Sequence, residues 1–171
     1  ELAEKITTLN CSMERLPFGD EELDVIWSEG AIYNIGFERG VKEWRRFLKV
    51  GGLLVVSEIT WITRSRPAEI EQYWEKEYPE IDLASSKMRI LEENGYAPVG
   101  YFILPEHCWL ANYYQPLLDS FDDFLARNGY SDAAQALVAA EKREIELYQK
   151  YKQYYSYGVY AARKVDGREP A

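Results

Sequence analysis

The strongest constraint on the fold of this chain comes from two short, mostly apolar runs. They flank a segment whose apolar residues recur with helical periodicity. The runs span residues 23–27 (LDVIW) and 53–57 (LLVVS). Between them, Phe37, Val41, Trp44 and Leu48 recur every three or four residues, which is typical of an amphipathic helix. The order strand, helix, strand with such apolar runs predicts parallel strands that are covered on both faces.

The first run ends abruptly in a small polar residue and a glycine. Ser28, Glu29 and Gly30 follow it directly. In open α/β sheets, ligands bind beside the carboxyl ends of the strands. The segment 28–37 is therefore the first candidate for a binding site.

The rest of the sequence extends this α/β pattern over a single domain of 171 residues. Glycines at 51 and 52 predict a turn between helix and strand that needs a positive φ. Hydrophobic periodicity and turn residues predict further strands at 5–9, 96–104 and 154–165, and helices at 67–78, 82–93, 106–128 and 131–151.

Composition excludes several classes of function. The net charge of −9 argues against nucleic-acid binding, which requires clustered Lys and Arg. No apolar run is long enough to cross a bilayer, and one histidine with two distant cysteines argues against a metal site. An acidic, cysteine-poor chain is most simply cytoplasmic. The 14 tyrosines and 5 tryptophans fit either a ligand pocket or an aromatic core and surface.

Three segments in order resemble class I S-adenosylmethionine-dependent methyltransferases of the small-molecule branch. They are residues 12–18 (SMERLPF), 23–31 (LDVIWSEGA) and 43–58, which ends in GGLLVVSE. The resemblance implies a Rossmann-like, mostly parallel sheet with an antiparallel terminal strand and the strand order 3-2-1-4-5-7-6. Residues 1–171 would form the C-terminal part of one methyltransferase domain, with a helical substrate or lid region at about 64–95 and 105–152.

The same resemblance assigns cofactor-binding residues to two loops. The loop that would line the adenine usually carries an acidic residue, whereas this chain has Ser12, followed by Met13 and Glu14. The methionine end and the sulfonium would lie beside Ser28, Glu29 and Gly30. Two simpler roles stay open: Met13 could fill the core, and Glu29 could stabilise the start of the following helical turn.

The acceptor side is implied by the same alignment. Tyr33 and Asn34 would face a small-molecule substrate, and Trp109 and Tyr113 could add an aromatic wall or simply form the buried face of their helix. His107 is the only side chain whose ordinary pKa lies near neutrality, so it is the candidate general base. A structural hydrogen-bonding role for this histidine is the alternative.

The family's glycine-rich cofactor loop has no counterpart here, because no G-x-G occurs among the 11 glycines. Strands 1 and 2 of the family would precede Glu1, and the strand over residues 23–27 would become an apolar edge open to pairing. We therefore expect the 171-residue chain to bind S-adenosylmethionine weakly and to form a homodimer or other self-association. The alternative to an enzyme is a non-catalytic module that partners a complete methyltransferase.

Overall fold

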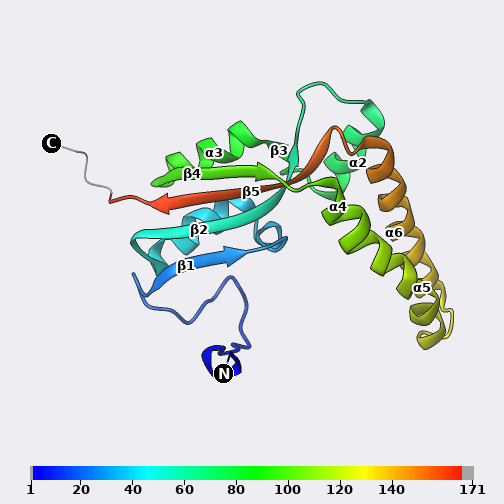
Figure 1. Cartoon of the computed structure of the whole chain (residues 1–171), viewed down its shortest axis with the longest axis horizontal. Coiled ribbons are helices and arrows are strands. Elements are labelled where there is room, and N and C mark those ends of the chain that lie inside the picture. Colours follow the sequence, from blue (N-terminus) through cyan, green and yellow to red (C-terminus); the bar gives the residue numbers. More distant parts are fainter. Residues whose placement is uncertain (1, 167–171) are drawn as a thin grey trace.

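The computed structural model describes residues 2–166 and contains one mixed five-stranded sheet (Figure 1). The main strand order is β1-β2-β5-β4, and the two-residue β3 pairs with β2. The strand bounds are β1 Leu23–Ser28, β2 Leu48–Trp61, β3 Asp82–Leu83, β4 Tyr96–Ile103 and β5 Tyr155–Lys164. Strands β1 and β2 are parallel, and β5 is antiparallel to both β2 and β4. This matches the 4-5-7-6 portion of the expected order.

The strand predicted over residues 5–9 is wrong. The structure has a short 3-10 helix at Ala3–Lys5, followed by residues without ladder hydrogen bonds, and Ile6 and Leu9 are exposed. Figure 1 shows this blue segment running outside the sheet, beyond β1. A strand is stabilised by its neighbours, and no strand within residues 2–166 pairs with this segment.

Two helices cover one face of the sheet. Helix α1 (Phe37–Trp44) and helix α3 (Ala84–Glu93) bury Phe37, Val41 and Leu91 against the inner residues of the strands. On β2, Leu54 and Val56 belong to this core. Because side chains alternate along a strand, Val55, Ser57 and Ile59 face the opposite side of the sheet.

The opposite face is only partly covered, which corrects the expectation of a sheet buried on both sides. Trp27 of β1 is 64% exposed and Phe102 of β4 is 56% exposed. Register places both on the face of Val55 and Ser57, because Trp27 pairs with Val55, and Phe102 and Ser57 each pair with Val159. This face is therefore an apolar surface that ends at the helices of the C-terminal half.

Those helices form a second hydrophobic cluster beyond one end of the sheet (Figure 1). They are α2 Ala68–Glu77, α4 Glu106–Trp109, a π-helical turn Leu110–Tyr114, α5 Gln115–Arg127 and α6 Asp132–Tyr151. The predicted helices agree with these bounds, apart from the π-helical turn. No helix among residues 2–166 has both the length and the apolar character needed to cross a bilayer.

The glycine pair predicted at a turn lies in an irregular stretch of β2. Leu23 of β1 pairs with Leu48 of β2, but Val25 of β1 pairs with Leu53, so β2 has extra residues at this point of the ladder. Gly51 there has a φ of 84°, so the predicted positive φ is confirmed. A side chain at Gly52 would come within 2.9 Å of the Lys49 carbonyl oxygen.

One carboxylate links α2 to α6. Glu69 accepts hydrogen bonds from Arg143 and Lys150, both at 2.6 Å, and from the Tyr151 hydroxyl at 2.5 Å. These bonds, with that from Lys150 the strongest, lower the pKa of Glu69 to about 2. The carboxylate thus fixes the helices that stand over the end of the sheet.

We expect Glu69→Gln to make stability less dependent on pH. Because the folded state lowers the pKa of Glu69, its stabilising effect is complete above the unfolded value near 4.5 and is lost as the pH falls towards 2. The decrease in melting temperature between pH 6 and pH 3 should be smaller in Glu69→Gln than in the unaltered chain. Glu75→Gln, an exposed change on the same helix, should retain the original decrease. An identical decrease in both variants would contradict this role.

The open edge of the sheet predicts self-association of the 171-residue chain. Within residues 2–166, β1 pairs only with β2, and Val25 is 49% exposed beside the free edge. Light scattering should give a mass above 19.9 kDa, and Val25→Lys should shift it towards the monomer, since charge at an edge opposes pairing. Leu137→Lys, at an equally exposed site on α6, should have no such effect. A monodisperse monomer of the unaltered chain would contradict the prediction.

Candidate active site

A cavity of about 810 Å³ opens at the carboxyl end of β1, on the partly covered face of the sheet. Its sheet side includes Val55, Ser57 and Ile59, the residues of β2 that alternate with the core. The helical side comes from α2, the α4–α5 region and α6. A cavity of this size is within the range of small-molecule sites, roughly 300–1,000 Å³.

The predicted loop after β1 lies in this cavity. Ser28, Glu29 and Gly30 all line it. Gly30 has a φ of 51°, and its N–H donates to Ser57 Oγ at 2.8 Å, which fastens the loop to β2. A Cβ at Gly30 would lie 3.4 Å from the Tyr157 hydroxyl, so glycine keeps this corner of the cavity open.

Ser28 lines the cavity, but strand alternation turns its side chain towards the other face of the sheet. Ser28 pairs with Val56, which belongs to the α1–α3 core, and the residue is 8% exposed. Its Oγ has no hydrogen-bond partner among the described residues. The feature of this loop that faces the cavity is therefore its backbone around Gly30.

Trp109 belongs both to the buried face of its helix and to the cavity lining, and substrate binding by it stays a prediction. Its ring stacks on Tyr148 and Tyr157, with centroids at 4.6 and 5.2 Å, and its indole N–H donates to Ser156 at 2.8 Å. The residue is nearly buried yet contributes to the cavity lining. Tyr113, one turn further along, also lines the cavity and is half exposed.

Tyr33 lines the cavity, whereas Asn34 is absent from the described lining. Tyr33 packs edge-to-face on Tyr78 with ring centroids 6.1 Å apart. The Asn34 amide instead turns back to donate to the Ala31 carbonyl oxygen at 2.9 Å. The structure thus brings only the first of these two predicted acceptor residues to the cavity.

The predicted adenine-side residues lie outside the cavity lining. Ser12 Oγ accepts from the Glu14 N–H at 3.3 Å, and Glu14 pairs with Arg39 at 2.8 Å. Met13 packs against the α1–α3 core, and its carbonyl oxygen accepts from Trp44 at 3.1 Å. Core packing, the simpler role for Met13, is therefore observed, and adenine binding by these residues stays a prediction.

His107 is also outside the cavity lining, although its neighbours Cys108 and Trp109 belong to it. The histidine is exposed, and its Nε2 lies 3.7 Å from Cys108 Sγ. No described contact holds it towards the cavity, so its role as general base stays a prediction without geometric support.

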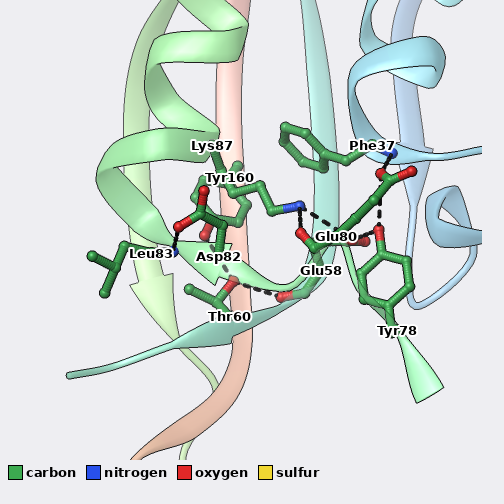
Figure 2. A network of polar contacts seen from close by, with 9 residues as sticks. All are labelled: Phe37, Glu58, Thr60, Tyr78, Glu80, Asp82, Leu83, Lys87 and Tyr160. Atoms are coloured by element: carbon green, nitrogen blue, oxygen red, sulfur yellow. Dashed lines mark hydrogen bonds and ion pairs between the residues drawn. The ribbon is translucent and has the colours of Figure 1, made fainter. Parts of the chain in front are cut away.

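The sequence interpretation missed a buried charged network that reaches the cavity (Figure 2). Glu58 on β2 is fully buried, and its Oε1 accepts from the Tyr78 hydroxyl and lies 3.6 Å from Lys87 Nζ. Lys87 on α3 donates to the Glu80 carbonyl oxygen at 2.8 Å and lies 4.6 Å from the Phe37 ring centroid. Tyr78 also lines the cavity, so it connects the ion pair to the site.

Burial dominates the protonation of this network. Desolvation raises the pKa of Glu58 and lowers the pKa of Lys87, and each shift is opposed by the charge of the partner. Desolvation together with the Glu58 charge raises the pKa of Tyr78, which therefore stays a hydrogen-bond donor. Glu58 Oε2 has no hydrogen-bond partner in the described part of the chain.

Glu80 extends the network to the loop that leads from the cavity. Its Oε2 accepts from the Phe37 N–H at 3.1 Å, at the first residue of α1. A carboxylate at this position stabilises a helix N-terminus. A Cβ at Gly36, whose φ is 87°, would lie 3.0 Å from Glu80 Oε1.

A half-buried carboxylate lies on the helical side of the cavity. Glu144 of α6 accepts from the Tyr114 hydroxyl at 2.9 Å, and burial raises its pKa. Glu77 and Glu141 line the cavity near it. Among residues 2–166, no cluster of His, Cys, Asp or Glu has the arrangement of a metal site.

One family model matches the N-terminal third of the chain. Residues 1–56 match the family described as a methyltransferase domain. A search of curated protein sequences finds no significant match.

Solved structures share the fold over nearly the whole chain. A proposed sarcosine dimethylglycine methyltransferase from Galdieria sulphuraria has a TM-score of 0.74 at 19% identity, with 98% of this chain and 62% of that chain covered. A methyltransferase from Geobacter sulfurreducens, solved with S-adenosyl-L-homocysteine, has a TM-score of 0.66 at 17% identity, with 86% and 60% covered. The cyclase SpnF has a TM-score of 0.68 at 22% identity, with 92% and 55% covered.

The chain has the class I methyltransferase fold. It spans 55% and 62% of the lengths of SpnF and the Galdieria protein. In this methyltransferase fold, the cavity lies at the end of β1 where the resemblance places the methionine end of the cofactor.

The buried pair beneath this site predicts a large, pH-dependent loss of stability in Lys87→Met. Removing one partner of a buried ion pair typically costs about 3–5 kcal/mol. Because protonation relieves the uncompensated charge on Glu58, the loss should be largest near pH 8 and smaller near pH 5. Urea unfolding at both pH values measures the loss in free energy of unfolding.

The double variant Glu58→Gln/Lys87→Met is the control for this prediction. It removes both charges, so its stability at pH 8 should exceed that of Lys87→Met. A Lys87→Met loss that is small, or equal at both pH values, would show that the pair contributes little.

Proposed function

We propose that this chain forms the acceptor pocket and the methionine end of the cofactor site in an S-adenosylmethionine-dependent methyltransferase that acts on a small molecule. The observation that carries the proposal is the cavity at the carboxyl end of β1, where the left-handed Gly30 leaves the backbone open to a ligand. This feature fits a polar ligand that approaches the backbone closely.

The residues of this chain would act mainly by positioning. S-adenosylmethionine supplies an activated methyl group, and transfer requires donor and acceptor in near-attack geometry. The backbone of Ser28, Glu29 and Gly30 would hold the methionine end, while Tyr33, Trp109 and Tyr113 would hold the acceptor. The carboxylates of the lining are the titratable groups placed to take a proton from an acceptor that carries one.

Related folds leave the acceptor open. Similar structures include a phosphoethanolamine N-methyltransferase from Haemonchus contortus and a geranyl diphosphate C-methyltransferase from Streptomyces coelicolor. Their identities to this chain are 16% and 20%. Since a fold does not fix a substrate, the acceptor class has to come from the lining of this cavity.

We expect Gly30→Val to weaken binding of S-adenosylmethionine by the native protein that contains this chain at least about tenfold, or about 1.4 kcal/mol. The valine would be strained at a φ of 51° and would fill the space beside Tyr157. Gly129→Val is the matched control, because Gly129 has a φ of 60° but no atoms close to the added Cβ. Calorimetry measures both variants.

Two results would overturn the proposed function. One is absence of S-adenosylmethionine binding by the unaltered native protein. The other is equal affinity of the Gly30→Val and Gly129→Val variants, which would place the cofactor away from this loop.

A further inference from the structure

The charge and the aromatic character of the cavity lining together select a class of ligand. We propose that the cavity binds an acceptor that carries a positive charge, namely a small organic ammonium compound with an apolar body. The inference rests on the proposed function only in that it treats the bound compound as the methyl acceptor. Binding of the cation can be tested independently of the cofactor.

The first argument is charge. Among the described residues, four carboxylates line the cavity and no Lys, Arg or His does; the carboxylates are Glu29, Glu77, Glu141 and Glu144. A cleft lined by one sign of charge concentrates ligands of the opposite sign. A phosphate-bearing acceptor would find no positive side chain in this lining, so an anionic acceptor is disfavoured.

The second argument is the aromatic wall. Eight of the lining residues carry aromatic rings, and their faces attract cations; they are Trp27, Tyr33, Trp74, Tyr78, Phe102, Trp109, Tyr113 and Tyr157. The rings of Trp109 and Tyr157 stack on each other, whereas Tyr33 and Tyr113 are 45% and 52% exposed. Trp27 and Phe102 are exposed as well, but Tyr113 is the exposed ring on which the charges of Glu144 and Glu141 act, so it is the ring best placed to receive an ammonium group.

The third argument is the position of Glu144. Tyr114 holds the carboxylate in a half-buried place, and the charges of Glu144 and Glu141 both act on the Tyr113 hydroxyl. Burying a carboxylate is costly unless a positive charge or hydrogen bonds compensate it. A cation bound between Tyr113 and Glu144 would supply that compensation.

The shape of the site separates it from an acidic surface. An acidic rim alone could be a solvated surface. The combination of an 810 Å³ cavity with exposed aromatic rings favours an occupied site.

The experiment compares choline with its uncharged carbon isostere, 3,3-dimethyl-1-butanol. The two probes differ in charge but match in shape, so their affinity ratio isolates the recognition of charge. Titrations of the native protein, followed by tryptophan fluorescence or calorimetry, should show choline binding at least about tenfold more tightly. Equal affinities, or preference for the uncharged alcohol, would overturn the inference.

Variants locate the site. Glu144→Gln and Tyr113→Leu should each reduce the choline preference several-fold, while Glu146→Gln, an exposed change on the same helix, should leave it unchanged. Retention of the full preference in both Glu144→Gln and Tyr113→Leu would also overturn the inference. Circular dichroism of each variant separates these effects from a loss of folding.

A parallel titration with S-adenosylmethionine distinguishes the two proposals. Cofactor binding without choline preference would reject the cationic acceptor and leave the methyltransferase function standing. Choline preference without cofactor binding would reject the methyltransferase function and retain the cation site.

Discussion

Strand β2 carries the constraint on which the rest of the structure depends, because its alternating side chains separate a core from a cavity. Leu54, Val56 and Glu58 point towards α1 and α3, whereas Val55, Ser57 and Ile59 point towards the cavity. Nine register pairs with β5 and the parallel pairing with β1 fix this arrangement. A shift of one residue would exchange the two faces, so packing of the core also fixes the chemistry of the cavity.

The same strand explains how a buried charge comes to lie beneath the site. Glu58 lies on the inward face of β2, where its buried negative charge needs a positive partner. Lys87 reaches it from α3. Tyr78 then connects the pair to the cavity, and Glu80 connects it to the start of α1 (Figure 2). The loop that leaves β1 is thus held at its far end by the network and at its near end by the bond from Gly30 to Ser57.

Local patterns in the sequence predicted most of the elements, because helix and strand periodicity are local properties. The strand at 5–9 failed since a strand needs a neighbour, and the π-helical turn at Leu110–Tyr114 has no periodic signature that distinguishes it from an α-helix. Gly30 could be predicted from its place after a strand. The sequence could not orient His107 near the start of α4, because the direction of its side chain depends on tertiary packing, nor Asn34, whose amide bonds the Ala31 carbonyl oxygen at the end of a short 3-10 helix.

The Glu58–Lys87 pair has only a weak signature in the sequence. Glu58 continues an apolar strand, and Lys87 lies on the face of α3 that Ala84 and Leu91 define at spacings of three and four residues. Taken alone, each of these charged residues is typical of an exposed position. Only the pairing of elements distant in sequence shows that they neutralise each other.

The fold by itself does not decide the chemistry, since the cyclase SpnF shares it. The central claim is that S-adenosylmethionine binds at the end of β1, and hydrogen exchange of the native protein with and without this cofactor tests it most directly. The account predicts slower exchange of the amides from Glu29 to Asn34, with little change in the loop around Gly129. Unchanged exchange at Glu29–Asn34 under saturating cofactor would contradict it.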